Sequence, residues 1–63
     1  MGYTIVVFDE HDHQAILGSW DTLTECREAW FNYTTRDENQ EYDIYFEMRD
    51  PEGYAIDGVQ FNK

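Results

Sequence analysis

The stretch that decides the fold is Tyr42-Asp43-Ile44-Tyr45-Phe46-Glu47-Met48-Arg49. Apolar side chains at its even positions alternate with polar or amphipathic side chains at its odd positions. Successive side chains of a strand point to opposite faces of the sheet. The pattern therefore predicts a β-strand with one buried face and one face in water.

The residues that follow this strand predict a tight hairpin. Asp50-Pro51-Glu52-Gly53 suits a type I turn, in which Pro takes the first central position. Gly53 then adopts the left-handed φ that closes a three-residue loop. This geometry sets Asp50 opposite Tyr54 and Met48 opposite Ile56.

The last strand needs one irregularity to bury its apolar side chains. With Ile56 on the core face, Val59 and Phe61 fall out of phase. One extra residue would restore the phase, and Gly within a strand often marks such a bulge. We therefore predict a β-bulge at Asp57-Gly58.

Before the central strand, the sequence predicts a helix. Thr22-x-x-Glu25 is a capping box, and Asp21 is an alternative cap one residue earlier. Helical spacing then places four apolar or aromatic side chains on one stripe that faces the sheet: Leu23, Cys26, Trp30 and Tyr33. The opposite face carries Glu25, Glu28 and Asn32.

Two further strands are predicted near the N-terminus. Residues 3–8 are rich in β-branched and aromatic side chains, and the polar run 9–13 separates them from a second apolar stretch at 14–20. The order is ββαββ, an α+β domain spanning residues 1–63 in which one helix packs on one face of a four-stranded antiparallel sheet. The pattern leaves open which strands join the two hairpins.

Charge is the most unusual property of the composition. The chain has 14 acidic residues and 4 basic ones, a net charge of -10. Such a surface repels nucleic acid and anionic membranes and accelerates association with basic proteins. We expect no direct nucleic-acid or membrane binding. No apolar stretch is long enough for a membrane span or a signal peptide, which predicts a cytoplasmic protein.

Candidate residues for chemistry are few. Metal-ligating side chains cluster only at Glu10-His11-Asp12-His13, and the sole thiol, Cys26, lies on the predicted helix. A structural zinc site needs four ligands and a catalytic one needs three. Neither Ser19 nor Cys26 lies in a known nucleophile motif. We therefore expect no metal, no cofactor and no enzymatic activity.

The candidate partner-binding surface consists of acidic side chains. On the outer side of the central strand lie Asp43, Tyr45 and Glu47, where an exposed Tyr45 would supply an aromatic anchor. A second row comprises Asp21, Glu25 and Glu28, and the connection between them carries Asp37, Glu38 and Glu41. Carboxylates spaced along a rigid sheet can imitate the phosphates of a nucleic acid.

In size, charge and element order the chain resembles the small acidic proteins that phages and other mobile elements use to disable host enzymes. These include DNA mimics and inhibitors of restriction or CRISPR systems. The resemblance implies a partner that is a basic protein, in particular a nucleic-acid enzyme, blocked without turnover. Two alternatives stay open: an immunity or antitoxin protein for a basic nuclease, and a small homodimeric or homo-oligomeric assembly protein.

Overall fold

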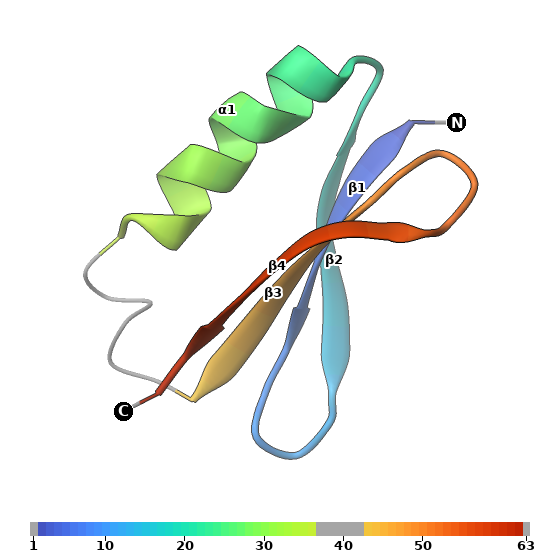
Figure 1. Cartoon of the computed structure of the whole chain (residues 1–63). Coiled ribbons are helices and arrows are strands. Elements are labelled where there is room, and N and C mark those ends of the chain that lie inside the picture. The colour runs from blue at the N-terminus through green and yellow to red at the C-terminus, as the bar shows by residue number, and fades with distance from the viewer. Residues whose placement is uncertain (1, 37–42, 63) are drawn as a thin grey trace.

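The computed structural model describes residues 2–36 and 43–62. Its elements are β1 (Tyr3–Phe8), β2 (Gln14–Trp20), α1 (Leu23–Thr34), β3 (Ile44–Arg49) and β4 (Ala55–Phe61). The strands form one antiparallel sheet in the order β2-β1-β3-β4, and α1 lies on one side of it (Figure 1). The predicted α+β fold and its ββαββ order are confirmed. The two hairpins meet through β1 and β3, the point that the sequence left open.

The core lies between α1 and the two central strands. Four side chains form the buried cluster: Ile5, Cys26, Phe46 and Met48. Phe46 is the centre of the aromatic packing, with ring centroids 6.5 Å from Trp30, 6.5 Å from Tyr33 and 5.8 Å from Phe61. The predicted helix stripe, with Cys26 buried and Leu23, Trp30 and Tyr33 partly buried, faces the sheet as expected.

Side-chain hydroxyl groups cap α1 at both ends. The backbone N–H of Glu25 donates to Oγ1 of Thr22 at 3.2 Å, and that hydroxyl donates to the Glu25 carboxylate at 2.9 Å. At the other end, Thr34 and Thr35 hydroxyls donate to the carbonyls of Trp30 and Phe31 at 2.8 and 2.7 Å. The predicted start at Thr22 is confirmed. In the described part of the chain, no helix is long and apolar enough to span a bilayer.

The β3–β4 hairpin has the predicted turn. The Gly53 N–H donates to the Asp50 carbonyl at 2.9 Å, the Asp50 N–H donates to the Tyr54 carbonyl at 2.8 Å, and Gly53 has φ 92°. The loop is therefore a three-residue hairpin loop closed by a left-handed glycine, with Asp50 opposite Tyr54.

The irregularity in β4 occurs one residue earlier than predicted. Met48 pairs with Asp57 and Arg49 with Ala55, so the extra residue is Ile56. The predicted pairing of Met48 with Ile56 is wrong, and Ile56 is 42% exposed rather than part of the core. The shift brings Val59 opposite Phe46, on the face that packs against α1.

The β1–β2 hairpin has the same kind of loop, although its sequence did not indicate it. The Asp12 N–H donates to the Asp9 carbonyl at 3.2 Å, the Asp9 N–H donates to the His13 carbonyl at 3.0 Å, and Asp12 has φ 64°. Asp12 therefore occupies the position that Gly53 takes in the other loop. A second register shift, between Ile5 and Val6, leaves Leu17 without a partner on β1 and in contact with the core.

Candidate partner-binding site

The face of the sheet opposite α1 carries the predicted side chains of β3. Tyr45 and Glu47 alternate with the core residues Phe46 and Met48, so they point away from the helix. Asp43 directly precedes β3 and is exposed. The structure therefore brings Asp43, Tyr45 and Glu47 to one face, as their spacing predicted.

Tyr45 is more enclosed than predicted. Its ring centroid lies 6.0 Å from that of Phe8, and the side chain runs over Gly58 of β4. A Cβ on Gly58 would approach the Tyr45 hydroxyl oxygen to 2.1 Å, so only glycine leaves room for this ring. The expectation of an exposed ring is therefore wrong: Tyr45 is half-buried and held in place.

A depression of about 470 Å³ lies beside Tyr45, and five carboxylates line it. The aromatic rings of Phe8 and Tyr45 and the side chain of Gln60 complete its lining. We call this feature the acidic depression, and its carboxylates are those of Asp9, Glu10, Asp12, Asp43 and Glu47. The depression exists because Phe8 pairs with Tyr45, which brings the loop after β1 beside the start of β3.

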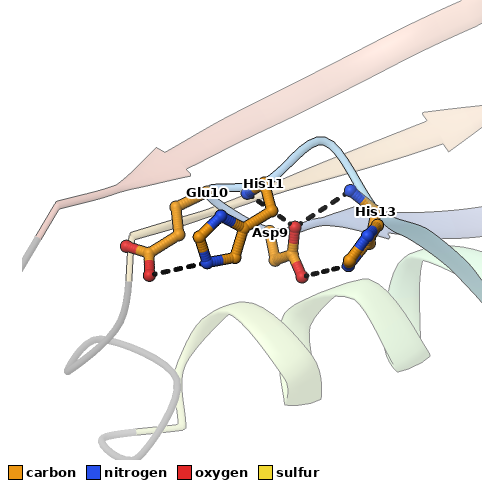
Figure 2. Close-up of polar contacts among 4 residues, drawn as sticks. All are labelled: Asp9, Glu10, His11 and His13. Atoms are coloured by element: carbon orange, nitrogen blue, oxygen red, sulfur yellow. Dashed lines mark hydrogen bonds and ion pairs between the residues drawn. The ribbon is translucent and has the colours of Figure 1, made fainter.

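Asp9 organises the loop after β1 through the contacts drawn in Figure 2, and residues of this loop line the acidic depression. Its Oδ1 accepts hydrogen bonds from the backbone N–H groups of His11 and His13 at 2.8 and 2.9 Å, and its Oδ2 lies 3.4 Å from Nδ1 of His13. Partial desolvation raises the pKa of Asp9, but these N–H groups and both imidazoles lower it by more, so the pKa lies below its usual value of 3.8. Asp9 is therefore ionised and engaged within the loop.

Glu47 is engaged as well. The Arg49 Nε–H donates to the Glu47 carboxylate, and the guanidinium carbon of Arg49 lies 5.9 Å from the centroid of the Phe8 ring. A cation in this position partly neutralises the Glu47 carboxylate and lies over the Phe8 ring. The Glu47 carboxylate is therefore already paired with a cation of the same strand before any partner binds.

The second predicted row lies on the other side of the molecule. Asp21 precedes α1, and Glu25 and Glu28 are exposed on the helix, whereas the acidic depression is on the opposite face of the sheet. The structure thus separates the helix carboxylates from Asp43, Tyr45 and Glu47. The remaining predicted residues lie outside the described residues: Asp37, Glu38 and Glu41.

No match to this chain is found among protein-family models, curated proteins or solved structures.

The carboxylates of the acidic depression can bind positively charged groups. Within residues 2–36 and 43–62, no group of three or more His, Cys, Asp or Glu side chains has a metal-binding arrangement. The rings of His11 and His13 have centroids 6.2 Å apart, and the His11 imidazole lies 3.5 Å from the Glu10 carboxylate. Burial raises the pKa of the Cys26 thiol, although Arg27 lowers it slightly, and the side chain is fully buried.

Sequence reasoning missed the loop carboxylates as part of the site. In the sequence, Glu10 and Asp12 stand out only as possible metal ligands, and Phe8 stands out only as a strand residue. The missing information was the pairing of β1 with β3, which places Phe8 opposite Tyr45. The sequence does show polar loops at the ends of the predicted strands, which can contribute to a site. It does not show which loop lies beside which strand.

Proposed function

We propose that this protein binds the basic surface of a partner protein through the acidic depression and performs no catalysis. The partner we propose is a nucleic-acid enzyme whose DNA- or RNA-binding groove the protein occupies. One observation carries the proposal: Glu10 and Asp12 of a hairpin loop lie beside Asp43, around the packed pair Phe8 and Tyr45.

An ordered aromatic pair surrounded by carboxylates is better suited to a protein interface than carboxylates spread over the whole surface. Ordered aromatic side chains dominate binding energy at interfaces, and Tyr45 is held over Gly58 before any partner arrives. Pre-organisation lowers the entropic cost of binding. The carboxylates around the aromatic pair would contact Lys and Arg side chains, including those that normally contact phosphates.

The net charge of -10 supports a basic partner. Complementary potentials raise the association rate, and the gain decreases steeply as salt screens the charges. The resemblance to small acidic inhibitors made by phages and mobile elements is consistent with an inhibitory role. On this basis the protein blocks its target stoichiometrically.

The test begins with capture at low salt. The full-length protein is immobilised and exposed to a nuclease-treated extract of the cells in which it is made, and retained proteins are identified by mass spectrometry. We expect a basic nucleic-acid enzyme that elutes with rising salt and loses its DNA or RNA binding when the protein is added. A captured nuclease encoded beside this protein would identify the target as a toxin.

Matched charge reversals then assign the surface. Glu10→Lys with Asp43→Lys changes the acidic depression, whereas Asp21→Lys with Glu28→Lys changes the helix side. Each substitution replaces a negative charge with a positive one, so both double variants have a net charge of -6 instead of -10. We expect the first to weaken binding at least tenfold, which is about 1.4 kcal/mol, and the second to weaken it less than threefold. Equal losses in the two variants would contradict a localised site.

A further inference from the structure

The outer edge of β2 is unusual for this chain because it has no charge. The strand order places β2 at the end of the sheet, and its seven residues, Gln14 to Trp20, include no Asp, Glu, Lys or Arg. Natural proteins commonly protect edge strands with charged side chains, Pro or bulges. The other edge strand, β4, carries Asp57. β2 has only the irregularity at Leu17.

The half of β2 nearest the hairpin loop presents its backbone to solvent. The Asp9 N–H donates to the His13 carbonyl, and hydrogen-bonded pairs alternate with non-bonded pairs along an antiparallel ladder. Ala15 therefore bonds to Val7, whereas the backbone groups of Gln14 and Ile16 point away from β1. Gln14 and Ala15 are exposed, and Ile16 is 71% exposed.

We propose that the outer edge of β2 accepts an extended segment of a partner protein as a fifth strand of the sheet. Main-chain hydrogen bonds would supply the affinity, and side chains would set the specificity, as in other cases of strand addition. Ile16 favours an apolar centre in the added segment. Acidic residues flank the strand at both ends, Asp12 before it and Asp21 directly after it, so the added segment has basic residues at its ends.

A second copy of this chain fits the same edge poorly. Antiparallel pairing of two β2 strands would bring Asp21 of one copy toward Asp12 of the other, and parallel pairing would bring identical acids together. Each copy also carries a net charge of -10. The charge pattern therefore favours a basic segment from a different protein. Asp12 lines the acidic depression and also precedes β2, but the backbone groups of Gln14 and Ile16 that would pair with the added strand lie outside the depression, so the two proposals can be tested separately.

The test uses a defined peptide and the full-length protein. The probe is Lys-Lys-Thr-Val-Thr-Val-Thr-Lys-Lys with blocked termini, and the control peptide replaces both Val residues by Pro, which keeps the charge and prevents strand pairing. Amide signals of the isotope-labelled protein are followed during titration. We expect only the first peptide to shift the signals of β2 and to slow hydrogen exchange at Gln14 and Ile16.

Two variants of Ile16 separate backbone pairing from charge attraction. Ile16→Pro removes an outward N–H without removing a bond to β1, whereas Ile16→Thr keeps the N–H in a strand-forming residue. We expect Pro to weaken peptide binding at least tenfold and Thr to weaken it less than threefold, with both amide spectra showing the native fold. If Ile16→Pro does not fold, Gln14→Pro with Gln14→Thr repeats the comparison.

Three results would overturn the proposal: equal binding of both peptides, equal binding by the Pro and Thr variants, or protection of Gln14 and Ile16 without peptide at concentrations where the protein dimerises. The last result would assign the edge to a second copy. Charge reversal in the acidic depression, at Glu10 and Asp43, is the separate test of the proposed function.

Discussion

At the scale of single residues, two aspartates build two loops in the same way. Asp9 and Asp50 each accept hydrogen bonds through Oδ1 from the backbone N–H groups two and four residues later. The loops differ at the position with positive φ, which is Asp12 in one and Gly53 in the other. A non-glycine residue is less stable in that conformation, although Asp tolerates it better than most.

This difference predicts opposite effects for two substitutions. Asp12→Gly should stabilise the protein by about 0.5 to 1 kcal/mol, and Gly53→Asp should destabilise it by a similar amount. An added Cβ at Gly53 meets no atom within 4 Å, so only backbone strain acts there. Urea denaturation measures both. Asp12→Asn removes the charge and keeps a side chain of the same size, so it should give less than half of the stabilisation expected for Asp12→Gly. Equal stabilisation by the two substitutions would show that the effect comes from the charge.

The lowered pKa of Asp9 predicts a pH dependence of stability. Since the pKa is lower in the native state than its usual 3.8, its contribution is complete above that value and is lost as the pH falls below it, through the native pKa. Asp9→Asn should therefore destabilise the protein at pH 7 and have a smaller effect at pH 2.5. Urea denaturation at both pH values tests this. Asp12→Asn supplies the baseline for removing a charge from the same loop.

At the scale of elements, one tight side-chain contact joins β3 and β4 in addition to their backbone pairing. Tyr45 needs the space above Gly58. Gly58→Ala should destabilise the wild-type protein by about 1 to 3 kcal/mol, in the range of overpacking. In a Tyr45→Ala background the same change should be neutral or stabilising by about 0.5 kcal/mol, because Ala is better than Gly within a strand. A double-mutant cycle of unfolding free energies tests the sign reversal.

The elements were predictable where sequence signals are local. The capping box at Thr22, the helix stripe and the turn at Asp50 depend on residues within a few positions of each other, and all three are present. The bulge in the last strand is predicted from the phase of its apolar residues. The phase shows that the strand needs one extra residue, but it does not fix the position of that residue. It occurs at Ile56 instead of Asp57-Gly58.

At the scale of the whole molecule, self-repulsion should be measurable. A net charge of -10 destabilises the compact state, and salt screens it. We expect the Tm to rise between 10 mM and 500 mM NaCl, and a gain of about 1 kcal/mol corresponds to roughly 4 to 8 °C. The Tm of the variant Asp21→Lys with Glu28→Lys should rise less over the same range of salt. A Tm of the wild-type protein that does not change with salt would contradict destabilisation by self-repulsion. Partner binding should weaken over the same range.

The site was predictable only in part, because it is formed by long-range pairing. Asp43, Tyr45 and Glu47 follow from alternation within one strand. Their neighbours in the acidic depression come from the loop after β1, and only the β1–β3 register reveals them. The helix carboxylates Glu25 and Glu28 lie across the sheet from Tyr45 because α1 packs on the face that carries Phe46 and Met48.

The strand order β2-β1-β3-β4 also has a kinetic consequence. Each hairpin closes a short loop, whereas the β1–β3 pairing must close the long segment that contains β2 and α1. Ordering that segment costs entropy before the pairing yields contacts, so non-local strand pairs slow folding. We expect the docking of the two preformed hairpins to limit the folding rate. Substitutions in the central strands should then slow folding, and substitutions at the outer edges should mainly accelerate unfolding.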